Sequence, residues 1–143
     1  MSSSVALRAS VLLAILVSGC GPDRPDVFPA GGQVVFDDGT PVRLGTVELL
    51  SEQHGINAVG TIRSDGSFVL GTFTGSDGAC AGKHRAIVTQ MIVADGLVRH
   101  QSDHGAPVDP AFGRYTSSPL TATISDKGPN SLRLTVKKAD RRK

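Results

Sequence analysis

The sequence predicts an all-β domain, a sandwich of two antiparallel sheets that is built from seven short strands. Three observations lead to this fold class. Apolar residues alternate with period two in several short runs, turn signals separate these runs roughly every 8 to 12 residues, and no apolar pattern at helical spacing persists for three turns. Four of the turn signals are Asp-Gly pairs, in which glycine accepts a positive φ angle and aspartate bonds its own backbone.

The first half of the domain is expected to supply four strands. A run at 33–36 turns at DDGTP, and a run at 46–50 follows with Val47 and Leu49 on one face. The segment AVGTIRSDGSFVLGTF, residues 58–73, is predicted to be a β-hairpin, because two β-prone arms flank the turn Ser-Asp-Gly-Ser. Its arms are the third and fourth strands.

The second half is expected to supply three more strands. The run RAIVTQMIV (85–93) is the longest and most apolar, which is typical of a central strand with both faces largely covered. The runs 119–125 and 132–137 alternate apolar and polar residues strictly. Between them and the central strand, residues 94–118 lack strand alternation and hold two prolines and three glycines. A connection this long is usually functional or disordered.

The N-terminus has the features of a secretory signal, expected to occupy residues 1–19. Arg8 is its only charge, residues 11–17 (VLLAILV) are all apolar, and two small residues precede Cys20. The apolar run is too short for a permanent transmembrane helix, which needs about 20 residues.

Residues 17–20 (VSGC) resemble a bacterial lipobox, an aliphatic residue and two small residues before a cysteine. The resemblance implies a mature chain that begins at Cys20 and carries a thioether-linked lipid and an acylated amine, such as palmitate. It implies export and attachment to a bacterial membrane, on its periplasmic or cell-surface side. An ordinary cleaved signal with a chance cysteine is the alternative.

The mature chain is expected to divide into three parts. A lipidated tether at 20–30 contains GPDRPDVFP, whose three prolines and three charges are not expected to form a strand or helix. A single β-sandwich domain follows at 31–137, since about 124 mature residues suffice for one domain. The basic tail at 138–143 is interpreted as a solvated, frayed end rather than a contact for phosphate or anionic lipid. No nucleic-acid partner is expected for an exported protein.

Four segments that span nearly all of residues 31–136 occur in the order and spacing of a known family. They are GGQVVFDDGTPVRLGTVEL (31–49), IRSDGSFVLGTFTGSDGA (62–79), AGKHRAIVT (81–89) and SPLTATISDKGPNSLRLTV (118–136). Together they resemble the carboxypeptidase regulatory-like domain, which belongs to the transthyretin-like (prealbumin-like) β-sandwiches. The resemblance implies that Gly66 turns the hairpin, that Phe68 and Leu70 fill the core and that Gly82 starts the long strand. It brings no catalytic residue and no cofactor.

Two positions depart from the family pattern and hold reactive side chains. Cys80 stands where proline is common, and His84 stands where an aromatic residue is common. With Cys20 lipidated, Cys80 has no partner for an intramolecular disulfide, so it is either a small buried residue or a reactive, dimer-forming thiol. We favour burial. A Cys80–His84 nucleophilic pair is disfavoured, because the residues between them start a strand that aims the two side chains differently.

The cluster HQSDH (100–104) is the most suggestive arrangement of metal-binding residue types. His100 and His104 are four residues apart, and zinc would need a further ligand from another segment. Glycine and proline nearby make a helix unfavourable, so solvated loop histidines are the preferred interpretation. The sequence has no phosphate-binding loop, Rossmann fingerprint or EF-hand pattern. No metal or cofactor site is therefore predicted.

The leading functional prediction is a non-enzymatic interaction or structural module at the cell envelope. Its expected contact surface is the 94–118 loop, because loops on rigid scaffolds usually carry recognition. The expected partner is an unknown envelope protein or polysaccharide, contacted by His100, His104, Phe112 and Tyr115. A polysaccharide-binding module is the first alternative, with Phe112 and Tyr115 as the stacking platform. A metal- or thiol-dependent enzyme is the second alternative.

Overall fold

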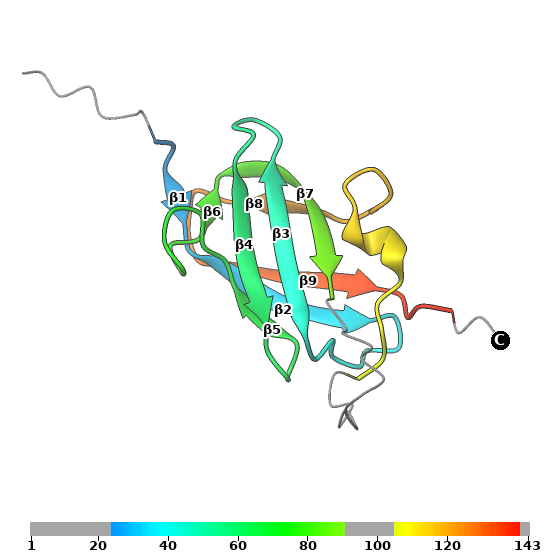
Figure 1. Cartoon of the computed structure of the whole chain (residues 1–143). Helices are drawn as coiled ribbons and strands as arrows, with labels where there is room; N and C mark the ends of the chain where they lie inside the picture. The colour runs from blue at the N-terminus through cyan, green and yellow to red at the C-terminus, as the bar shows by residue number, and fades with distance from the viewer. Residues whose placement is uncertain (1–23, 91–104, 141–143) are drawn as a thin grey trace, which may run out of the picture.

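The structure, a computed structural model, describes residues 24–90 and 105–140 and is almost entirely β-sheet. Within these residues nine strands form a four-stranded sheet in the order β4-β3-β7-β8, a three-stranded sheet β5-β2-β9 and a small pair β1-β6 (Figure 1). The strands are β1 (Val27–Phe28), β2 (Ala30–Phe36), β3 (Gly45–Ser51), β4 (Asn57–Ile62), β5 (Ser67–Val69), β6 (Ala79–Cys80), β7 (Gly82–Thr89), β8 (Thr121–Ile124) and β9 (Asn130–Val136). One 3-10 helix, η1 (Pro110–Gly113), precedes β8. The all-β prediction is confirmed.

The two larger sheets face each other and share one apolar core, as in a β-sandwich. Val47 and Leu49 from β3 are fully buried on one side, and Val34 and Val136 from β2 and β9 are fully buried on the other. Each strand contributes alternate residues to this core, since successive side chains of a strand point to opposite faces. The buried positions of Phe68 and Leu70 also agree with expectation.

The predicted hairpin at 58–73 is confirmed in part: its turn is correct, and its arms are joined by an antiparallel bridge between Val59 and Gly71, whose amides and carbonyls exchange hydrogen bonds of 2.9 and 3.0 Å. Gly66 has a φ of 82°, and the Arg63 amide donates to the Ser67 carbonyl at 2.9 Å. However, β4 pairs with β3, while β5 pairs antiparallel with β2 in the opposite sheet. The ladder of β5 is thus formed with β2, and it continues past β5 through the Leu70 amide, which donates to the Ala30 carbonyl at 2.9 Å. The turn therefore passes the chain from one sheet to the other.

The sandwich also departs from the expected seven antiparallel strands. β2 and β9 pair in parallel along seven positions, from Ala30 with Asn130 to Phe36 with Val136. β9 follows a connection from β8 in the other sheet, so it enters beside β2 in the same direction rather than through a hairpin. The short strands β1 and β6 are the two additional strands.

Strand β1 lies inside the segment that was expected to be an extended tether. Val27 pairs with Cys80, and Phe28 pairs with Ala79. Prolines 25 and 29 flank β1 without interrupting it, because a two-residue strand leaves both prolines outside the ladder. The prediction that residues 21–29 form no strand is wrong for these two residues.

The long central strand is confirmed in position and only partly in burial. β7 lies between β3 and β8 and begins at Gly82, whose φ is 109°. Lys83 and Arg85 are exposed on the outer face, whereas Ile87 on that face is buried. One face of this strand is therefore covered throughout and the other only in part; residues 91–93 of the predicted run lie outside the described ranges.

Different segments of the chain form the two ends of the sandwich. We call the end that contains β1, β6 and the described chain start at Arg24 the N-terminal end, and the opposite end, with the 37–44 turn, residues 105–113 and 137–140, the far end (Figure 1). No helix within residues 24–90 or 105–140 has the length and hydrophobicity to cross a membrane.

Candidate functional site

Residues 105–118 are fastened to the far end of the sandwich as an extension beside β9. Val108 forms a β-bridge with Lys138. On either side of this bridge, the Asp109 amide donates to the Lys137 carbonyl and the Ala139 amide donates to the Pro107 carbonyl, both at 2.9 Å. The described part of the predicted contact loop therefore has a defined position.

The basic tail begins inside this attachment. Lys138 bridges to Val108 and also donates from its ammonium group to the Asp38 carboxylate in the turn after β2. As expected for a solvated end, Lys138 is exposed, but the expectation that the end is also frayed is wrong for Lys138 and Ala139, because their backbone groups complete a ladder that continues past β9. Residues 141–143 lie outside the described part of the chain.

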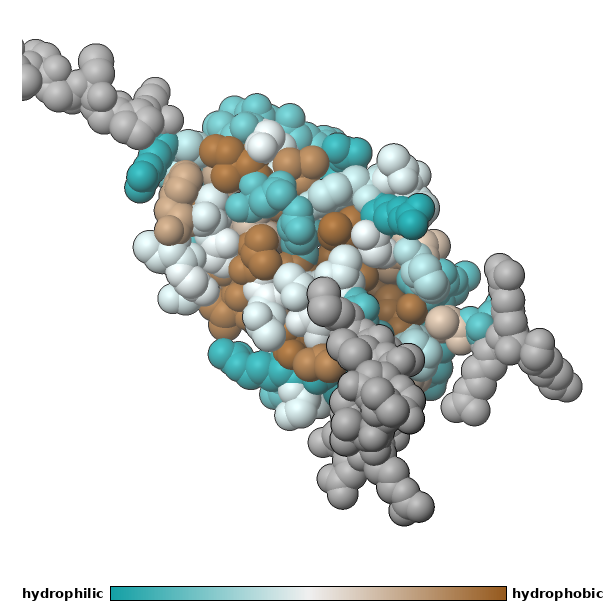
Figure 2. Space-filling view, viewed as in Figure 1, coloured by the Kyte–Doolittle hydropathy of each residue, from teal (hydrophilic) through white to brown (hydrophobic). Residues whose placement is uncertain are grey.

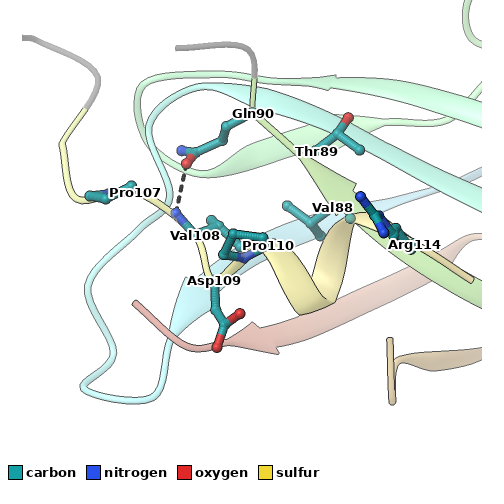
Figure 3. A pocket seen from close by; sticks show the side chains of 9 residues that line it. Val88, Thr89, Gln90, Pro107, Val108, Asp109, Pro110 and Arg114 are labelled. Atoms are coloured by element: carbon teal, nitrogen blue, oxygen red, sulfur yellow. Dashed lines mark hydrogen bonds between the residues drawn. The ribbon is translucent and has the colours of Figure 1, made fainter. Parts of the chain in front are cut away.

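The side-chain amide of Gln90 joins three segments at this end. Its Nε2 donates to the Leu44 carbonyl at 2.9 Å, and its Oε1 accepts from the Val108 amide at 2.7 Å (Figure 3). Gln90 directly follows β7, so this one side chain links the central strand to the turn before β3 and to the extension. The sequence prediction missed this role, although a polar residue within an otherwise apolar run was a usable signal.

The 3-10 helix η1 closes the core beneath the extension. Asp109 caps it, since its carboxylate accepts from the Ala111 amide at 2.9 Å, and Pro110 occupies the first turn, where no amide donor is required. Phe112 then points inward and is only 6% exposed, within the cluster to which both sheets contribute. The expected partner contact through Phe112 is contradicted, because its ring fills the core.

A hollow of about 310 Å³ opens between β7 and the extension (Figure 3). Its lining combines apolar side chains, from Val88, Pro107, Val108 and Pro110, with polar and charged ones, from Thr89, Gln90, Asp109 and Arg114. Arg114 is exposed, with a guanidinium that provides five donors in a planar fork suited to a carboxylate. The hollow therefore offers a small, mainly apolar depression bordered by one acidic residue, Asp109, and one cationic donor group, Arg114, which suits a peptide-like ligand.

A polar cluster lies on the outer face of the four-stranded sheet. The Tyr115 hydroxyl donates to Glu48 Oε1 at 3.0 Å, the Asn57 amide donates to the same oxygen, and the Arg85 guanidinium carbon lies 5.4 Å from the Tyr115 ring centroid. Burial, together with the hydrogen bond to Glu48, raises the pKa of Tyr115 above its usual value of 10.0. Figure 2 shows hydrophilic and hydrophobic side chains interspersed on this face. Tyr115 is thus half-buried and held in place by Glu48, a residue that the sequence prediction did not single out.

Two residues with reactive side chains, Cys80 in β6 and His84 in β7, are both buried. Cys80 is a free cysteine packed in the interior, as expected. Burial raises the pKa of its thiol, and a protonated thiol is a weak nucleophile. His84 is also buried, with Nδ1 3.1 Å from the Gly82 carbonyl oxygen, and burial lowers its pKa below 6.5.

The remaining predicted contact residues, His100 and His104, lie outside the described residues. Among the residues that are described, no group of three or more His, Cys, Asp or Glu side chains is arranged to hold a metal ion. The candidate site therefore consists of the far-end hollow and the nearby Tyr115 cluster. Comparison with protein-family models, curated proteins and solved structures finds no match for this chain.

Proposed function

We propose that the protein is a non-enzymatic lipoprotein of the bacterial cell envelope, whose carboxypeptidase regulatory-like β-sandwich serves as an interaction or structural module. In this proposal Cys20 carries the lipid and the sandwich presents its far end to an envelope partner. The lipobox-like residues VSGC and the order of the four family-like segments support the two halves of the proposal.

One observation carries the choice of contact surface. Residues 105–113 are fixed at the end of the sandwich opposite the point where the chain arrives from Cys20. A hollow bordered by Gln90 and Arg114 lies there, on a segment held by backbone bonds to β9 and by the Gln90 amide. A recognition surface on such a prepositioned segment loses little conformational entropy when a partner binds.

The contact surface can be tested with a photoreactive amino acid placed at Arg114 in intact cells. We expect cross-links from position 114 and none from the exposed His54 position in the turn between β3 and β4, at the other end of the sandwich. With the photoreactive amino acid still at position 114, the cross-links should disappear when Pro110 is also replaced by a bulky residue that fills the hollow. Equal cross-linking from both ends, or silence at position 114, would contradict the assignment.

Lipidation is tested separately with a metabolically incorporated palmitate analogue. The label should enter the parent protein and the Cys80→Ser variant, and it should be lost in Cys20→Ser. Because Cys80 is buried, its substitution controls for thiol labelling that does not depend on the lipobox.

A polysaccharide-binding module is the second candidate, and the Tyr115 cluster favours it. A half-exposed tyrosine beside a carboxylate, an amide and a guanidinium offers both stacking and hydrogen-bonding groups for a sugar. Phe112 cannot extend this platform, since it is buried. Glycan-array binding that is lost in Tyr115→Ala and in Asn57→Ala would establish this candidate, and binding that neither change affects would exclude Tyr115.

A further inference from the structure

The loop 72–78, which joins β5 to β6 at the N-terminal end, holds an exposed phenylalanine in a fixed turn. The Asp77 carboxylate accepts hydrogen bonds from the amides of Thr72, Phe73 and Thr74, at 2.7, 3.1 and 3.0 Å. The Thr72 hydroxyl donates to the Gly78 carbonyl at 2.7 Å. These bonds fix the loop backbone while the Phe73 side chain remains 38% exposed.

Phe73 also contacts the first described residue of the chain. The Arg24 guanidinium carbon lies 5.2 Å from the Phe73 ring centroid. The ring is therefore covered on one side by a cationic group that is itself exposed. An aromatic ring with an arginine over it has an apolar body and a polar cap, a combination suited to the interface between lipid headgroups and acyl chains.

The surface beside this loop holds two further exposed apolar side chains, at a hollow that Thr61 and Arg63 also line. Val59 and Val69 are 43% and 40% exposed, and they line a hollow of about 470 Å³ together with Gly75 and Ser76 of the loop. The hollow lies where β4 and β5 diverge into different sheets. Of the large hydrophobic side chains recorded as exposed in the described ranges, three lie on this loop or line the hollow beside it, and the fourth, Leu44, lies at the far end.

Chain length limits how far this surface can be from the membrane. Three residues lie between Cys20 and Arg24, and the four steps from one to the other span at most about 14 Å in an extended chain. By contrast, the seven residues of β2 place the far end about 20 Å beyond the N-terminal end. A lipid on Cys20 would therefore hold the Phe73 loop, and not the far end, within reach of the headgroups.

Net charge does not explain this surface. The segments that contribute to this surface hold two arginines, Arg24 and Arg63, and three aspartates, Asp26, Asp65 and Asp77, so their acidic and basic groups nearly balance. Asp77 is occupied by the loop amides, and Asp65 accepts from the Ser67 amide. The tether length and the exposed apolar groups, rather than electrostatic attraction, select the lipid surface as the occupant.

From these observations we infer that Phe73 and the neighbouring Val59 and Val69 form a membrane-docking surface that seats the N-terminal end of the sandwich on the lipid bilayer, with Arg24 at the level of the phosphates. The inference rests on the proposed lipidation of Cys20. It adds a fixed orientation to that anchor, so that the far end points away from the membrane.

Fluorescence tests the docking surface directly, because the chain contains no tryptophan. The lipidated full-length Phe73→Trp variant is reconstituted into vesicles of phosphatidylethanolamine and phosphatidylglycerol with brominated acyl chains. We expect a blue-shifted emission that the brominated lipid quenches. The matched Leu44→Trp variant, which is exposed to a similar degree at the far end, should emit as in water and remain unquenched.

Each other outcome overturns the inference. Unquenched, water-like emission at position 73 means that the loop stays in solvent, and a blue shift without quenching means that protein, either a partner or a second copy, covers it. Equal quenching at positions 73 and 44 excludes a fixed orientation. The mass of the N-terminal peptide is measured in the same samples: a diacylglyceryl group on Cys20 with an unquenched Trp at position 73 refutes docking alone, whereas an unmodified Cys20 refutes the anchor and the docking together.

Discussion

Replacing Phe112 by alanine tests whether the 105–118 extension is part of the core or a surface attachment. The ring is 6% exposed and packs within the cluster shared by both sheets, on a 3-10 helix that contacts β7. Removing a buried phenylalanine side chain costs the transfer free energy of the ring and leaves a cavity, together about 3–5 kcal/mol. Since domains of this size are stable by about 5–15 kcal/mol, the variant should lose a large share of its stability.

The assay is urea unfolding followed by circular dichroism, with the free energy of unfolding extrapolated to water. With a slope of about 1–3 kcal/mol per molar urea, the midpoint for Phe112→Ala should fall by at least about 1 M. The control is Phe73→Ala, which removes the same ring from a position that is 38% exposed. Its cost should stay below about 1 kcal/mol, because exposed side chains contribute little to folding.

The comparison of the two phenylalanines can refute the reasoning in two ways. If both variants unfold with the parent midpoint, Phe112 does not belong to the core. If Phe112→Ala keeps the parent midpoint and loses a partner or a glycan instead, Phe112 has the contact role that its sequence context suggested, and the placement of η1 is wrong.

Three further predictions concern the groups that hold the two ends of the sandwich. Gln90→Ala removes two hydrogen bonds and leaves the Val108 amide unpaired, so it should cost about 2 kcal/mol and speed hydrogen exchange at that amide; unchanged exchange would contradict the linking role. In Gly78→Ala, at a φ of 98°, the new methyl group would lie 1.8 Å from the Phe28 carbonyl oxygen, so β1 should detach. The control is Gly39→Ala, where a φ of 83° is strained but nothing lies within 4 Å. The melting temperature of Gly78→Ala should fall well below that of this control. Burial lowers the pKa of His84 below 6.5, so the unfolded chain takes up the proton first as the pH falls, and the free energy of unfolding should decrease from pH 7 to pH 5. In His84→Phe the part of this decrease that comes from the imidazole should be absent when the free energies of unfolding are compared at the two pH values.

The sequence predicts the faces of the strands well, because each strand buries one face and the alternation is local. Val47 and Leu49 in β3, and Ala122 and Ile124 in β8, are buried as the period-two pattern indicates. The turn at Gly66 is also predicted correctly, since a glycine with a positive φ is a property of a few adjacent residues.

Strand partners are not predicted, because alternation identifies a face and not a neighbour. Ala30 pairs with Asn130 across a separation of 100 residues, in the parallel direction that the hairpin-based reasoning did not anticipate. A single β-bridge, between Val59 and Gly71, joins the arms of the predicted hairpin in the described residues, whereas β5 itself pairs with β2. Both pairings are decided by how the two sheets close over the core, which no short segment encodes.

The candidate site is less predictable than the fold for the same reason. Phe112 has no periodic context, so an isolated aromatic residue in a long loop gives no signal of burial. Glu48 lies on the polar face of β3, and the tyrosine that it holds is 67 residues away. Gln90 acts through an amide whose two partners come from different segments, and a single polar residue does not predict such partners.

The two attachments together determine what a membrane-bound form of this protein can reach. β1 is paired to β6 at one end, and the extension is bonded to β9 and Gln90 at the other, so neither end of the described domain is joined through a flexible hinge. Under the proposed anchoring, the height of the far-end hollow above the bilayer is then set by the length of β2, about 20 Å, rather than by the tether. A partner that is itself held at the membrane must therefore present its contact group at that height to bind the hollow.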